Sequence, residues 1–134
     1  MKITSLLAVV FAASVMQSTA WAQTSPITRT PVTKADMTGT TREIVMLRAD
    51  FAPGALADWH THPGEEISYV MEGEVVLEIA GEAPRKINAG EGFIVPARAP
   101  HKGHNQSDKP MKLLVNLTVE KGQPLSTPVA PPTK

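Results

Sequence analysis

The chain contains no cysteine, few aromatic residues and no excess of charge of either sign. The absence of cysteine excludes a disulfide framework, a thiolate metal site, a cysteine nucleophile and a lipid-modified N-terminal cysteine. Because 13 Lys and Arg residues balance 13 Asp and Glu residues, the chain lacks the net basic charge typical of proteins that bind nucleic acid or anionic lipid unaided. We therefore expect a small-molecule partner and no nucleic acid, with any chemistry carried by His, Asp and Glu.

The chain also lacks an apolar run long enough to cross a bilayer. The run at residues 6–13 is too short for a span, follows Lys2, and is succeeded by polar residues and then Ala20-Trp21-Ala22. This order is typical of a secretory signal peptide cleaved after Ala22, and no twin-arginine pair precedes it. An N-terminal membrane anchor or a core helix is the alternative. We expect a periplasmic or secreted protein, exported by the general route, without a stable membrane anchor after cleavage.

The 134 residues suffice for one domain, and its ends differ from its middle. We expect a signal peptide at residues 1–22, an extended N-terminal arm at 23–35, a folded barrel at 36–120 and a Pro-rich disordered tail at 121–134. Within residues 36–120, short β-type runs alternate with Gly, Pro, Asn and Asp, and no apolar stripe has helical spacing. This pattern predicts an all-β sandwich or barrel of short antiparallel strands.

Two histidines are spaced to point at one place. In a regular strand over residues 55–62, Asp58, His60 and His62 share one face, and Glu66 follows after a short loop. Two imidazoles and a nearby carboxylate are half of a plausible metal site, although a hydrogen-bonded histidine pair is equally compatible with these residues alone. A further histidine from elsewhere in the chain is needed.

Two groups of residues then resemble the paired motifs of the cupin superfamily, in particular its small single-domain bacterial members. The first group is Gly54, His60, His62, Glu66 and Gly73, and the second is Gly90, Pro96, His101 and Asn105. The resemblance covers about residues 36–120 and implies a double-stranded β-helix, or jelly-roll, barrel. It also implies that His60, His62, Glu66 and His101 bind a metal. The chain departs from the second motif at Arg98, where the family usually has glycine.

The resemblance implies a divalent transition metal, and the nitrogen and oxygen ligands are compatible with Fe, Mn, Ni, Cu or Zn. A six-coordinate ion would keep two positions open for a substrate. The expected function is a metal-dependent oxidoreductase of dioxygenase type acting on a small oxygenated organic molecule. A non-catalytic cupin that binds a carbohydrate or organic acid, and a metal-dependent isomerase or lyase, are the alternatives.

Several residues near the motifs have weaker predicted roles. Arg98 and Asp58 are candidate catalytic residues, Arg98 as a clamp for a carboxylate or enolate and Asp58 as a partner of a ligand imidazole. The motif spacing selects Glu66 over Glu65, and strand parity places His104 opposite to His101. Ser68 is a further inward candidate, and the possible pocket walls are Trp59, Tyr69 and Phe93. A small barrel with a sheet face to cover is also expected to form a homodimer.

Overall fold

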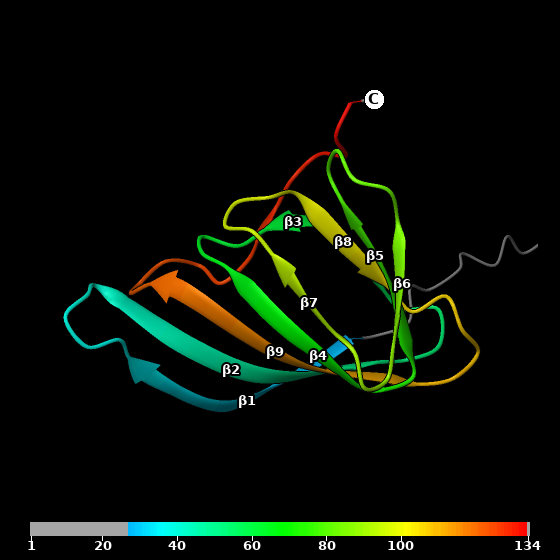
Figure 1. Ribbon diagram of the computed structural model, residues 1–134, viewed down its shortest axis with the longest axis horizontal. Helices are drawn as coiled ribbons and strands as arrows, with labels where there is room; N and C mark the ends of the chain where they lie inside the picture. The colour runs from blue at the N-terminus through cyan, green and yellow to red at the C-terminus, as the bar shows by residue number, and fades with distance from the viewer. Residues whose placement is uncertain (1–26, 134) are drawn as a thin grey trace, which may run out of the picture.

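A computed structural model describes residues 27–133, which form two antiparallel β-sheets of five strands each (Figure 1). This confirms the predicted all-β, jelly-roll class. Within residues 27–133, no helix is long and apolar enough to span a membrane. The ten strands are β1 (Ile27–Asp36), β2 (Arg42–Phe51), β3 (Leu56–Thr61), β4 (Glu66–Glu72), β5 (Glu74–Ile79), β6 (Arg85–Asn88), β7 (Gly92–Val95), β8 (His101–His104), β9 (Met111–Glu120) and β10 (Thr127–Pro128).

The chain crosses repeatedly between the two sheets. The first sheet has the order β1-β2-β9-β4-β7, and the second has the order β10-β3-β8-β5-β6. From β2 to β5 each successive strand changes sheet, and the same holds from β6 to β9. As a result, the residues that begin β4 and β8 are brought from different sheets to one region between them.

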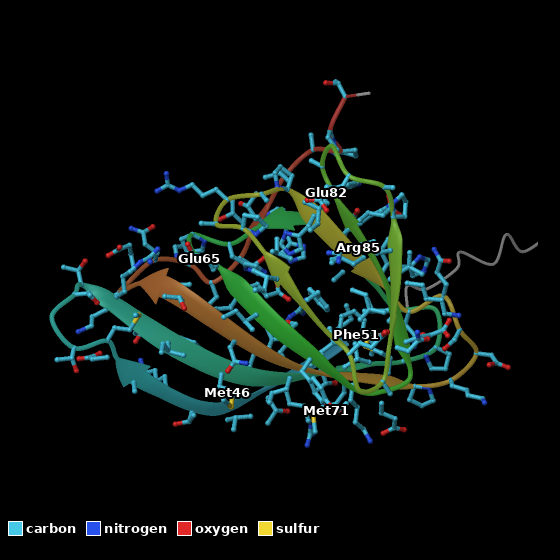
Figure 2. The ribbon with its side chains drawn as sticks, viewed as in Figure 1. Met46, Phe51, Glu65, Met71, Glu82 and Arg85 are labelled. Carbon is cyan, nitrogen blue, oxygen red and sulfur yellow. The ribbon has the colours of Figure 1, made fainter. Side chains whose placement is uncertain are left out.

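The core lies between the sheets and follows the period-two alternation of the strands. In β9 every second residue from Met111 to Val119 is buried, and β4 and β5 show the same alternation. Phe51 is buried between the sheets, whereas Met46 and Met71 lie on the far side of the first sheet (Figure 2). Burial on one face only is what separates a sandwich sheet from the doubly buried strands of a parallel sheet.

The turn between β4 and β5 requires glycine. Gly73 has φ +76°, and a Cβ added there would lie 2.7 Å from the carbonyl oxygen of Pro110. Both the left-handed conformation and this close approach exclude a side chain. The glycine of the first sequence motif is therefore used for chain geometry.

Both ends of the described chain pair with the sheets. The arm expected at residues 23–35 is, from Ile27 onward, a strand paired with β2 along its whole length. The tail expected to be disordered at 121–134 returns to the second sheet, where β10 pairs with β3 and the Val129 amide donates to the Trp59 carbonyl at 3.0 Å. Its prolines limit the donors available but leave the carbonyls free to pair. The predicted signal peptide lies outside the described residues.

The outer face of the first sheet exposes several large apolar side chains. Those on β2, β4 and β7, here called the outer apolar face, are Ile44, Ile67, Tyr69, Met71 and Ile94. Ile67 pairs directly with Ile94, so these two side chains are neighbours. Each of the five is at least 42% exposed, and such a cluster commonly marks a surface that another molecule covers.

Candidate metal centre

Three strands from two sheets bring four potential metal ligands together. His60 lies on β3, His62 follows that strand directly, His101 begins β8, and Glu66 begins β4 on the opposite sheet. One ligand atom from each residue lies within 4.8 Å of all the others. His62, Glu66 and His101 are buried and His60 is partly buried. The structure thus assembles the four residues that the cupin resemblance implies.

An irregularity in β3 determines which side chains reach this cluster. The pairing of β3 with β8 shifts between Ala57 and His60, so that both residues line the same pocket although they are three positions apart. The expectation that Asp58 shares the face of His60 was based on a regular strand and is corrected here. Asp58 is exposed, and its carboxylate accepts a hydrogen bond from the Trp59 amide at 2.8 Å. Its contribution to the cluster is its backbone carbonyl, which contacts His60.

Each of the three imidazoles is oriented through Nδ1 by a backbone carbonyl. The His60, His62 and His101 Nδ1 atoms lie 2.6, 2.5 and 2.9 Å from the carbonyl oxygens of Asp58, Leu125 and Ala99. A carbonyl oxygen only accepts, so each Nδ1 must carry the proton and donate it. In a neutral imidazole with this tautomer, Nε2 has the unshared electron pair by which histidine binds a metal.

The resulting arrangement fits a cation. His62 Nε2 lies 2.9 Å and His101 Nε2 lies 3.3 Å from the same oxygen, Glu66 Oε2. His101 Nε2 is buried and has no hydrogen-bond partner of suitable geometry among the described residues. Unprotonated imidazole nitrogens and a carboxylate oxygen repel one another at these distances, and a proton or a metal ion between them removes that repulsion. The donor set therefore fits a divalent transition metal.

The protonation of these groups suits the same role. Burial lowers the pKa of His60 to about 4, in part offset by the Asp58 carbonyl, so the imidazole is neutral at neutral pH. Burial alone would raise the pKa of Glu66, but its contacts with His101 and His62 and a hydrogen bond from Ser68 hold that pKa well below the usual range. The Ser68 hydroxyl donates to Glu66 Oε1 at 2.6 Å, which leaves Oε2 facing the imidazoles.

The four residues form one end of a cavity of about 120 Å³ between the sheets. Its walls are otherwise mainly apolar side chains, Phe93 among them as expected. Trp59 and Tyr69, also expected as walls, do not line it. The Trp59 ring lies beneath the Lys102 ammonium at 5.3 Å, and Tyr69 belongs to the outer apolar face.

Arg98 occupies a different place from the one expected of a substrate clamp. It lines a second surface pocket with Thr61, His62 and Glu120, and it does not line the cavity that all four ligands share. Its amide donates to the His62 carbonyl at 2.9 Å, and its φ is +62°. The position that carries glycine in the family motif thus keeps the left-handed backbone although the residue is arginine.

Glu65 and His104 both lie outside the cluster. The Glu65 carboxylate is half-exposed and lies 3.6 Å from the Arg42 guanidinium (Glu65 is labelled in Figure 2). His104 is at the far end of β8, paired with Leu56 and Val76, and is partly buried. The motif spacing that selects Glu66 therefore agrees with the geometry.

Three residues that line the cavity come from segments not expected to contribute to it. They are Arg29 on β1 and, just before β10, Leu125 and Ser126. Each lies in a segment whose composition predicted an extended arm or a disordered tail. The pairing of β1 with β2 and of β10 with β3 brings them in, and no local pattern of residue types encodes such long-range pairing.

Known proteins share this fold and parts of this sequence. The chain is 33% identical over 72 residues to 3-hydroxyanthranilate 3,4-dioxygenase of Danio rerio, a match that covers 52% of this chain and 23% of that protein. It is 34% identical over 79 residues to germin-like protein subfamily 2 member 2 of Arabidopsis thaliana, covering 55% of this chain and 36% of the relative. The chain thus spans about a quarter to a third of the length of these relatives.

Two solved structures resemble the fold at similar identity. An oxalate oxidase superposes with a TM-score of 0.58 at 30% identity, covering 64% of this chain and 46% of the other. The protein TT1209 from Thermus thermophilus superposes with a TM-score of 0.58, also at 30% identity, covering 74% of this chain and 90% of the other. The family model described as "Cupin domain" matches residues 47–117, which is more than half of the 134 residues. The chain belongs to the cupin domain family.

Proposed function

We propose that this protein is a metal-dependent oxidoreductase of dioxygenase type that acts on a small oxygenated organic molecule. One observation carries the proposal: three imidazoles and the Glu66 carboxylate converge, with one ligand atom of each within 4.8 Å of the others. When bound there, a transition metal would hold and activate O2 and substrate oxygens. The similarity to 3-hydroxyanthranilate 3,4-dioxygenase and oxalate oxidase favours oxygen chemistry over hydrolysis.

The residues around the metal site have different roles in this proposal. His60, His62, His101 and Glu66 hold the ion, and three backbone carbonyls fix the imidazoles. The apolar cavity walls exclude bulk water from the ion and limit the substrate to a small molecule. Orientation of the substrate then depends on the few polar groups that reach the cavity.

The metal site is tested by elemental analysis of untagged protein. We expect about one transition metal per chain, retained in His104→Ala and lost in His101→Ala. The two substitutions remove the same side chain from the two ends of β8, but only His101 belongs to the cluster. Equal metal content in the two variants, or wild-type protein that stays metal-free after reconstitution, would contradict the proposal.

The reaction class is tested with the same protein. Oxygen consumption during turnover of a candidate substrate would support the dioxygenase type. Turnover without oxygen consumption would identify an isomerase or lyase. Metal-bound protein that binds small organic acids or sugars but converts none would identify a binding protein.

We also propose that the chain is exported and assembles as a homodimer. Export rests on the predicted signal peptide at residues 1–22, and N-terminal sequencing of protein from the cell envelope or medium should begin at Gln23. An intact Met1 in the recovered protein would contradict export with cleavage. The dimer rests on the outer apolar face, which a second copy would cover.

A further inference from the structure

Among the described residues that line the metal cavity, Arg29 brings the only guanidinium. It lies near the start of β1, at the edge of the first sheet (Figure 1), where it pairs with Ala49. Directly paired residues of antiparallel strands face the same side of a sheet. Ala49 is buried and lines the cavity, so the Arg29 side chain points to the cavity side, and its exposure places it where the cavity meets solvent.

Within residues 27–133, no carboxylate neutralises this guanidinium. Arg42 and Arg48 both form ion pairs, with Glu65 and Glu120 and with Asp50, but no ion pair or side-chain hydrogen bond joins Arg29 to another described residue. The Arg29 side chain is exposed, so its donors are hydrated and a ligand can displace that water. The Arg29 donors are therefore available to a ligand.

The charge of the cavity favours an anion. Its lining contains one carboxylate, Glu66, and three imidazoles, which bind a metal as uncharged ligands. With a divalent ion bound, the charges of the ion, Arg29 and Glu66 sum to a net charge of +2. The apolar walls lower the local dielectric and strengthen this attraction relative to water. An uncharged ligand would leave both excess charges uncompensated.

We propose, as a specification of the function proposed above, that Arg29 binds the carboxylate of a small, largely apolar organic acid whose other oxygen faces the metal. Guanidinium and carboxylate match in a planar, two-bond geometry, which fixes the orientation of the acid as well as its presence. A volume of about 120 Å³ suits a compact acid and excludes an oligosaccharide. Arg29 is thus a specificity-determining residue at the end of the cavity that faces solvent.

The test compares an acid with its uncharged amide. Zinc-loaded full-length protein, which avoids oxygen chemistry, is titrated calorimetrically with 2-hydroxyisobutyrate and with 2-hydroxyisobutyramide. Wild-type protein should prefer the acid. Arg29→Gln should weaken binding of the acid about 10- to 100-fold and change binding of the amide by less than about twofold, as expected for loss of a charge-assisted hydrogen-bond pair. Arg29→Lys should fall between.

Arg48→Gln is the matched control. It removes the same charge from the same sheet, but Arg48 follows Leu47 in β2 and therefore faces away from the cavity. Zinc content measured in every variant separates the two proposals. Unchanged acid binding in zinc-loaded Arg29→Gln, or no preference of the wild type for the acid, overturns the role of Arg29. Wild type that holds no zinc overturns the metal site, and Arg29-dependent acid binding by that metal-free protein would still support the anion site.

Discussion

Among residues 27–133, Arg98 is the one non-glycine residue with positive φ. Left-handed backbone costs an L-residue with a side chain roughly 1 kcal/mol relative to glycine, although glycine regains part of that entropy when the chain unfolds. We therefore expect Arg98→Gly to raise the free energy of unfolding by about 0.5–1 kcal/mol, measured by denaturant titration. Metal content should be unchanged, because Arg98 does not line the metal cavity.

Arg98→Ala separates backbone from side chain. It removes the guanidinium but keeps the strained backbone, so it should lack the added stability of Arg98→Gly. If both variants lost turnover with metal still bound, the Arg98 side chain would have a role in substrate binding that its place in the second pocket does not indicate.

Ser68 shows how one buried hydroxyl can matter for the metal. It is 2% exposed and donates to Glu66 Oε1, so it determines which carboxylate oxygen faces the imidazoles. We expect Ser68→Ala to weaken metal affinity about 10-fold with the fold intact, measured by competition with a chromophoric chelator. Ser107→Ala removes a hydroxyl that bonds only within the loop after β8 and should leave affinity unchanged. Equal metal affinities in the two variants would show that Ser68 does not determine the orientation of Glu66.

At the residue scale, the predictions based on motif spacing agree with the structure. The motifs select His60, His62, Glu66 and His101, and the structure brings these four residues together. Asp58 was misplaced because its face was inferred from a regular strand, and the register shift in β3 changes that face. Such a shift depends on packing against β8, for which the residues of β3 alone give no signal.

At the scale of elements, the C-terminal segment contributes to the metal site although the sequence predicted a disordered tail there. The Leu125 carbonyl accepts from His62 Nδ1 at 2.5 Å, and β10 pairs with β3 beside His60. Removing residues 124–134 should therefore weaken metal binding about 10-fold or more and open the cavity to solvent, since Leu125 and Ser126 line it. Metal affinity and binding of a hydrophobic dye are the measurements.

A shorter deletion provides the control. Removing residues 130–134 leaves Leu125, β10 and the hydrogen bond from Val129 to Trp59 in place. Its metal affinity should equal that of the full chain. Similar losses in the two deletions would attribute the effect to something other than the contact with His62.

The elements that sequence reasoning located are those with a run of apolar, β-favouring residues between turn residues. Each of the stretches beginning at Arg42, Val75 and Met111 contains such a run, and each overlaps a strand of the structure. The strands β1 and β10 lack such a run, and nearly every residue of both is exposed. They are held by backbone pairing to a neighbour, which composition does not reveal.

For the whole molecule, the outer apolar face makes association testable. We expect wild-type protein to have the mass of a dimer by light scattering at micromolar concentration. Ile67→Glu should shift it to monomer, because the charge would be buried without a partner in the interface. Val76→Glu places the same charge on the outer side of the second sheet, where the neighbouring Val75 and Leu77 face the core, and should leave the dimer intact. A monomeric wild type would contradict this assembly.

The edge strand β1 of the first sheet also limits how copies of the protein can associate. Pro31 lies in the middle of β1, and the register with β2 shifts between Pro31 and Thr33. Proline offers no amide hydrogen, and a bulge twists the strand away from a straight edge, so a further strand cannot extend the ladder along β1. Copies of this protein are therefore expected to resist stacking through the β1 edge, the kind of edge-to-edge contact by which β-proteins grow into fibrils.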